Sequence, residues 1–217
     1  MAVIKPFKAI RPSKGLEDKI AALPYDVYNR SEAKEAVKGN PLSFLNIDRP
    51  ETQYDDDFDM YSEESYQTAA KLLTGMLERE EYIRDDNAYY YIYELTMNGR
   101  AQTGIVATAS VDDYINETIK KHENTRADKE LDRIRHVDTL SAQTGPIFLA
   151  YKSNDVINFI VDKVKGTEPL YDFVSDDSIS HRVWIISDSD DISSIQNAFS
   201  TINSIYIADG HLSLIHI

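Results

Sequence analysis

The 217-residue sequence contains no cysteine and no apolar run of the length that a membrane helix requires. Without cysteine, the chain can form neither disulfides nor thiolate metal sites. A membrane-spanning helix needs about 20 largely apolar residues in a row. The first residues, MAVIKP, also lack the charged region and apolar core of a secretory signal peptide. These absences predict a cytoplasmic protein that has no membrane partner.

Positive charge is also scarce, because 23 Lys and Arg residues face 37 Asp and Glu residues, a net charge of −14. Nucleic-acid binding depends on a basic surface that neutralises phosphates, so a nucleic-acid partner is not expected. Part of the acidic excess lies in residues 51–59, ETQYDDDFD. This stretch predicts a solvated acidic surface loop, with a cation site as the alternative.

Helix and strand signals alternate along the chain, which predicts an α/β fold of mixed α+β type, with a mixed sheet flanked by helices. The predicted strands cover residues 3–11, 88–95, 101–111, 146–151, 170–174, 182–187 and 204–208, and the predicted helices cover residues 31–38, 62–81, 125–142, 155–165 and 189–199. Residues 23–27 are expected to be extended, because the residue before Pro24 is disfavoured in helix geometry. The strands around Asn98-Gly99 should form an antiparallel hairpin, since Asn-Gly is the strongest short hairpin signal.

The densest group of charged side chains lies in residues 119–136, IKKHENTRADKELDRIRH. If residues 125–142 are helical, Arg126, Lys129 and Arg133 share one face at steps of three and four residues. A row of cations can hold phosphate oxygens, and arginine does so with two parallel hydrogen bonds.

His122 and Glu123 precede this row and form a candidate acid/base or ligand pair. They lack the second histidine of a zinc-protease motif, so no metal site is predicted from them. The alternative for the whole segment is a solvated surface helix, in which Glu130 and Asp132 pair with the basic side chains three or four residues later.

A second candidate site is the stretch YIADGH, residues 206–211. An apolar strand that runs into Asp209-Gly210 makes a tight turn, and glycine lets a phosphate approach the backbone. Asp209 can bind Mg²⁺ or accept a proton, and His211 can donate to an oxyanion. A plain surface turn is the alternative. Tyr25-Asp26 is a weaker candidate, for which a capping or turn aspartate is the alternative.

Six stretches occur in order along residues 1 to about 211. They are IKPFKAIRP (4–12), LPYDV (23–27), NPLSFLNIDRPE (40–51), KHENTRADKELDR (121–133), GPIFLAY (145–151) and IADGH (207–211). Together they resemble the domain-of-unknown-function family 1015 of bacterial and archaeal proteins. That family is similar to the ParB/sulfiredoxin superfamily, which includes an ADP-dependent free-serine kinase and CTP-binding ParB proteins.

The resemblance implies phosphate-handling chemistry, with Asp209, Gly210 and His211 in a turn that holds nucleotide phosphates. The resemblance also favours a site role for five residues of the charged segment 119–136, namely His122, Glu123, Thr125, Arg126 and Arg133. The first hypothesis is a nucleotide-dependent small-molecule kinase or other phosphotransferase. In this enzyme Glu123 is the base, Arg126 and Arg133 bind phosphates, and Mg²⁺ accompanies ADP, ATP or CTP. The second is a non-catalytic nucleotide-gated module like the ParB proteins.

The last six residues, LSLIHI, depart from the family pattern, which continues as DGHHR into a helix. The same six residues are encoded by the start of a transposase adapter used in sequencing libraries. We therefore expect residues 1–211 to be the N-terminal part of a longer family domain and residues 212–217 to be a non-native tail. Such a fragment would lack the phosphate-binding arginine and is expected to be inactive by itself.

Overall fold

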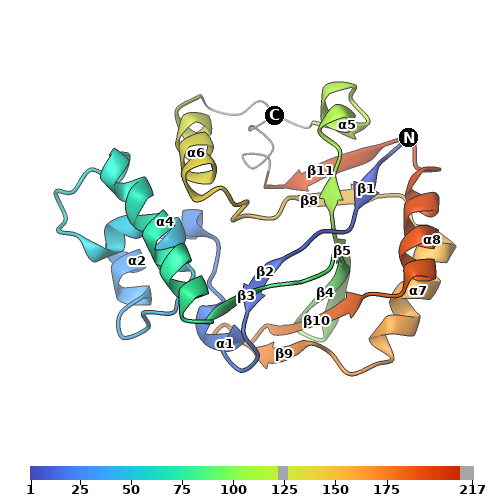
Figure 1. Cartoon of the computed structure of the whole chain (residues 1–217), viewed down its shortest axis with the longest axis horizontal. Helices are drawn as coiled ribbons and strands as arrows, with labels where there is room; N and C mark the ends of the chain where they lie inside the picture. Colours follow the sequence, from blue (N-terminus) through green and yellow to red (C-terminus); the bar gives the residue numbers. More distant parts are fainter. Residues whose placement is uncertain (122–126, 211–217) are drawn as a thin grey trace.

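Two hydrophobic cores organise the fold, one beneath a four-stranded sheet and one among the helices of the N-terminal half. The computed structural model describes residues 1–121 and 127–210, with residues 127–130 as backbone alone. Figure 1 places helices α2, α4 and α6 on one side and α7 and α8 on the other, with the strands between them. The fold is mixed α/β, as the sequence predicts.

The four-stranded sheet is antiparallel throughout, in the order β5-β4-β10-β9. Its strands are β4 (Tyr90–Met97), β5 (Arg100–Val106), β9 (Tyr171–Val174) and β10 (Ser180–Ile186). Helices α7 (Asp155–Lys165) and α8 (Ser189–Phe199) bury Ile157 and Ile195 in the core beneath this sheet. Asn154 caps α7, and Asp188 caps α8, one residue before the predicted Ser189.

The predicted hairpin is confirmed. Met97 pairs with Arg100, so only Asn98 and Gly99 form the loop, and both have positive φ, of 52° and 78°. This geometry is the two-residue turn whose twist matches that of the flanking strands. The second strand ends at Val106, earlier than predicted, because the chain then forms β6 (Thr108–Ala109) and helix α5 (Val111–Ile115).

A smaller sheet has the order β7-β11-β8 and consists of β7 (Ile119–Lys120), β8 (Phe148–Tyr151) and β11 (Ile205–Asp209). Strand β11 runs parallel to β7 and antiparallel to β8. The carboxyl ends of β7 and β11 therefore lie at the same edge as the start of β8. Residues that follow Lys120 and Asp209 leave the sheet at this edge, which we call the β11 edge.

Two short strand pairs connect the N-terminus to the rest of the fold. Strand β1 (Ile4–Lys5) pairs with β6, and β2 (Ile10–Pro12) pairs with β3 (Tyr82–Arg84). The prediction of one continuous strand over residues 3–11 is therefore wrong. The chain turns between two different partners, with a single bridge from Phe7 to Tyr89.

The N-terminal half supplies six helical segments, of which α1, α3 and α4 pack with α6 (Ala127–Leu140) around the second core. They are α1 (Glu17–Ile20), the 3₁₀ turn η1 (Tyr25–Val27), α2 (Arg30–Ala36), α3 (Leu45–Asp48), the 3₁₀ turn η2 (Pro50–Gln53) and α4 (Glu63–Glu78). Ser62 caps α4, as predicted, by accepting a hydrogen bond from the Ser65 backbone. The extended conformation predicted for residues 23–27 is wrong beyond Pro24, because Tyr25–Val27 is helical. Within residues 1–121 and 127–210, no helix is both long and apolar enough to cross a membrane.

We predict that Gly99→Ala lowers the free energy of unfolding by about 1–2 kcal/mol, because a Cβ disfavours the positive φ that this turn requires. Gly104→Ala is the matched control in the same hairpin: its φ is not positive, and nothing lies within 4 Å of an added Cβ. Urea denaturation of both variants measures the difference. Equal stability of the two would show that the turn does not depend on glycine.

Candidate functional site

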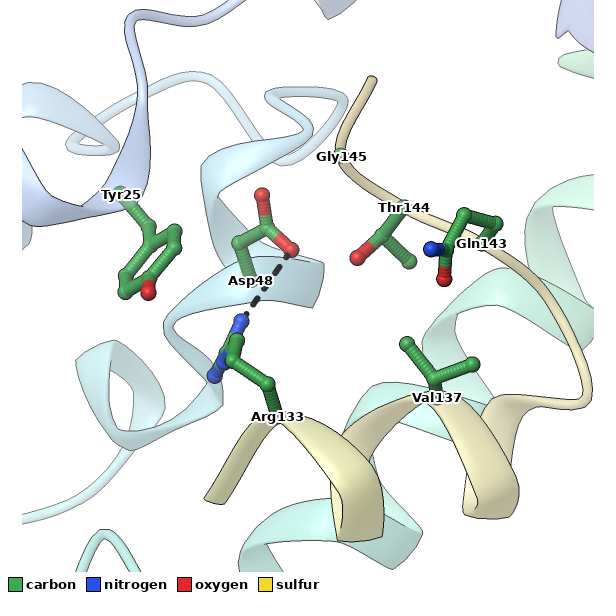
Figure 2. A pocket seen from close by; sticks show the side chains of 7 residues that line it. All are labelled: Tyr25, Asp48, Arg133, Val137, Gln143, Thr144 and Gly145. Carbon is green, nitrogen blue, oxygen red and sulfur yellow. Dashed lines mark ion pairs between the residues drawn. The ribbon is translucent and has the colours of Figure 1, made fainter. Parts of the chain in front are cut away.

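A small cavity of about 30 Å³ lies where η1, α3, α6 and the loop before β8 meet. Its walls are formed by Tyr25, Asp48, Arg133, Val137 and residues 143–145. Figure 2 shows the Asp48 carboxylate and the Arg133 guanidinium side by side, with the Thr144 side-chain oxygen facing Asp48. Such a cavity holds about two water-sized groups, so it fits one small polar group.

Arg133 projects from α6 into this wall, where its side chain is only 11% exposed. Its guanidinium lies over the Tyr25 ring, 4.2 Å from the centroid. Its Nε and Nη2 donate to Asp132 Oδ2 at 3.2 and 3.1 Å, and Asp132 Oδ1 accepts from the Tyr66 hydroxyl at 3.0 Å. The charge of Arg133 is therefore already compensated by a neighbouring carboxylate.

Arg49, between α3 and η2, forms a buried ion pair and also holds η1 in place. Arg49 donates from Nε to Glu51 at 2.5 Å, and these side chains are 9% and 2% exposed. The Nη1 atom of Arg49 also donates to the backbone oxygens of Tyr25 and Tyr28, at 2.9 and 2.8 Å. Both Nε and Nη1 of the guanidinium thus have partners, and Arg49 holds the turn that carries the Tyr25 ring.

Asp48 is the least satisfied polar group of the site. Its Oδ1 atom is buried without a hydrogen bond and lies 4.0 Å from Arg133 Nη1, beyond hydrogen-bond distance. Burial raises the pKa of Asp48 to about 6, although Arg133 and a hydrogen bond from Thr144 act in the opposite direction. A carboxyl group with this pKa exchanges its proton close to neutral pH.

His136 fastens α6 to α3. It is 1% exposed, and its Nε2 donates to the Ile47 carbonyl at 3.0 Å, which leaves Nδ1 without a hydrogen-bond partner. Burial lowers the pKa of His136 to about 4, with a further contribution from the charge of Arg133. The imidazole is therefore neutral at physiological pH and has a structural role next to the cavity.

The turn at Asp209-Gly210 lies at the β11 edge. Gly210 has a φ of 74°, and an added Cβ would lie 3.1 Å from the Pro146 carbonyl oxygen. Asp209 Oδ1 accepts from the Gly210 backbone at 2.7 Å. Pro146 follows Gly145, which lines the cavity, so Gly210 and the cavity wall are separated by no more than about 10 Å.

The structure thus brings together part of the predicted site. Tyr25 and Arg133 line one cavity, and Asp209 and Gly210 lie near it. Asp26 is exposed and does not line the cavity. His122, Glu123, Thr125, Arg126 and His211 lie outside the described residues.

The alternative of a solvated surface helix is wrong for the face of α6 on which Asp132, Arg133 and His136 are buried together, whereas Leu131, Arg135 and Asp138 are exposed. His136 bonds to the backbone of α3, so the expected pairing of Asp132 with His136 is replaced by a tertiary contact. Where side chains are described, no group of three or more His, Asp or Glu side chains is placed to hold a metal ion.

Sequence reasoning missed Asp48, Arg49 and Glu51. The prediction that residues 51–59 form a solvated loop is wrong for Glu51, which is 1% exposed, whereas Asp55 to Asp57 are exposed as expected. All three missed residues belong to the stretch NIDRPE. The signal was the alternation of acidic and basic residues that begins at the last residue of α3, Asp48, and ends at Glu51.

We predict that Asp48→Asn raises the free energy of unfolding at pH 7 by about 1–3 kcal/mol. The pKa of Asp48 is about 6 in the folded chain, above the unfolded value of about 4, so the folded protein loses stability as the pH rises through this window. The variant lacks that loss. Urea denaturation at several pH values should show a gain at pH 7 that disappears near pH 4, and a gain that does not vary with pH would contradict the assignment.

We also predict that Arg49→Ala lowers the free energy of unfolding by about 3–5 kcal/mol, because it leaves Glu51 buried without a cation. Arg79→Ala is a matched control, since Arg79 forms the same two-residue pairing with Glu81 but is 59% exposed. Thermal denaturation should show a large loss for the first variant and little change for the second. Similar losses for both would mean that burial of the Arg49–Glu51 pair has no special weight.

A family model described as "Protein of unknown function (DUF1015)" matches residues 4–214. Comparison with curated proteins and with solved structures gives no significant match. Because the family model matches nearly the whole chain, including the segments that build the cavity and the β11 edge, the chain belongs to the DUF1015 family.

Proposed function

We propose that the protein binds a nucleotide or a phosphorylated small molecule at the β11 edge and transfers its phosphoryl group, as a small-molecule kinase does. The observation that carries the proposal is the convergence of two features at one place. The glycine turn at Asp209-Gly210 packs against Pro146, and the preceding residue, Gly145, lines the cavity that contains Asp48 and Arg133.

The topology of the small sheet supports a ligand at this edge. Ligands of open α/β sheets bind outside the carboxyl ends of parallel strands, and β7 and β11 are such a pair. In sequence, His122, Glu123 and Arg126 follow β7 and precede α6. The proposal assigns Glu123 as the base and Arg126 as the phosphate ligand.

The charges around the cavity argue against a phosphate inside it. Arg133 is compensated by Asp132 at 3.1 Å and lies 4.0 Å from Asp48, so this cavity does not offer a free cation to an anion. The proposal therefore places the phosphates beside the glycine turn at Gly210, and Mg²⁺ with Asp209 would neutralise part of their charge. ADP, ATP and CTP are the candidate nucleotides.

We predict that Gly210→Ala weakens nucleotide binding at least about tenfold. The new methyl group would lie 3.1 Å from the Pro146 carbonyl oxygen and 3.3 Å from the Ile147 Cα, so the turn that holds the phosphates would have to shift. Gly39→Ala is the matched control: its φ of 77° imposes the same backbone strain, but nothing lies within 4 Å of its added Cβ. Titration of ADP, ATP and CTP with Mg²⁺, followed by amide chemical shifts, measures both variants. Equal affinities, or no binding by the unsubstituted chain, would reject the phosphate site.

Phosphoryl transfer is tested on the protein expressed from the resequenced gene. ³¹P NMR then follows the loss of the nucleotide phosphate and the appearance of a phosphorylated product. The enzyme hypothesis expects Glu123→Ala to abolish transfer and to retain nucleotide binding. Binding without any transfer by the unsubstituted protein would instead favour a nucleotide-gated binding module.

A further inference from the structure

The unsatisfied Oδ1 atom of Asp48 is the one carboxylate oxygen among the described residues that is both buried without a hydrogen bond and part of the cavity wall. A buried carboxylate oxygen without a donor is costly, because desolvation is not offset by any bond. Figure 2 shows this oxygen directed into the space between Arg133, Val137 and Thr144. A ligand group that donates a hydrogen bond would satisfy it.

The local charges determine which donors fit. The groups around the cavity are the carboxylate of Asp48, the carboxylate of Asp132 and the guanidinium of Arg133, while the Tyr25 hydroxyl stays neutral because burial raises its pKa. The neighbouring His136 is neutral, because burial lowers its pKa to about 4. With Asp48 ionised, the sum is negative, so a neutral or cationic donor is favoured over an anion.

The size of the cavity sets a second limit. A volume of about 30 Å³ accommodates a hydroxymethyl or ammonium group and is too small for a nucleobase or a ribose. The Tyr25 ring, the Val137 side chain and the backbone at Gly145 complete a wall that is partly apolar. Such a wall suits the carbon atoms next to a single polar group.

We propose that Asp48 binds the hydrogen-bond donor, a hydroxyl or an ammonium group, of a small alcohol or amino alcohol that is the acceptor of the phosphoryl group. The role of this molecule as phosphoryl acceptor rests on the proposed function, whereas its binding to Asp48 does not. The phosphoryl donor lies beside Gly210, and the small acceptor lies in the cavity, whose wall residue Gly145 is within about 10 Å of that turn. Asp48 thereby determines which acceptors the protein takes.

The test uses ethanolamine and glycerol as donor probes and inorganic phosphate as the anionic probe. Each is titrated at millimolar concentration and constant ionic strength into the 217-residue chain, and the amide signals of Thr144 and Gly145 are followed. We expect at least one donor probe to shift both signals and phosphate to leave them unchanged. Phosphate binding at these residues, or no response to either donor probe, would overturn the proposal.

Two variants connect the binding to Asp48. Asp48→Asn keeps the shape of the side chain and should lower the affinity for the donor probe at least tenfold. Asp113→Asn is the matched control, because Asp113 is also a buried carboxylate, 5% exposed, and accepts from the Val3 backbone at 2.6 Å away from the cavity. The affinity of the Asp113→Asn variant for the probe should equal that of the unsubstituted chain. Equal affinity of the chain and Asp48→Asn would overturn the proposal.

A third measurement needs no substitution. An ammonium probe bound to Asp48 favours its ionised form, so ethanolamine should lower the pKa of the Asp48 carboxyl, measured by ¹³C NMR. An unchanged pKa at saturating ethanolamine would count against direct contact. Donor binding that persists when ADP, ATP and CTP all fail to bind would support the Asp48 subsite while rejecting phosphoryl transfer, so the two proposals fail separately.

Discussion

The buried contact between Arg49 and Glu51 is the constraint on which the candidate site depends. The guanidinium joins η2 to η1, because one side of it meets Glu51 and the other meets the backbone oxygens of Tyr25 and Tyr28. The position of the Tyr25 ring follows from this clamp, and the ring in turn covers Arg133 on α6. Without the clamp, one wall of the cavity would have no fixed position.

Arg133 in turn belongs to a chain of polar contacts that fixes the other walls of the cavity. Tyr66 on α4 donates to Asp132, Asp132 accepts from Arg133, and Arg133 faces Asp48 at the end of α3. Buried charges of this kind contribute little net stability, since desolvation offsets most of their attraction. Their effect is positional: each group has one geometry in which its partners are satisfied, and Asp48 Oδ1 is the atom that the chain of contacts leaves open.

Local signals in the sequence predict the elements that depend on near neighbours. Asn98-Gly99 specifies its hairpin, Ser62 caps its helix, and α7 has the predicted bounds Asp155–Lys165. The 3₁₀ turn at Tyr25 could not be predicted in this way, because its conformation is held by Arg49, whose contact to Tyr25 spans 24 positions.

The candidate site was predictable only in part for the same reason. The charged pattern of α6 indicates solvent exposure as readily as ligand binding, and the burial of Arg133 results from α3 and η1, which lie far away in sequence. In the sequence, Asp48 is marked only by its place among the alternating charges of NIDRPE, which do not indicate that it is buried. Burial by distant segments raises its pKa to about 6, while Arg133 and Thr144 act in the opposite direction.

The segments that resemble the family meet in space, and this arrangement gives the site its logic. Four separate stretches, residues 23–27, 40–51, 121–133 and 145–151, supply the cavity residues Tyr25, Asp48, Arg133 and Gly145, respectively. The turn at Gly210 packs on Pro146 and Ile147, directly before β8. A cavity assembled from so many distant segments exists only when the whole fold is formed. An open hydrogen-bond acceptor at its centre reduces stability by about 1–3 kcal/mol, a cost that a bound donor group would remove.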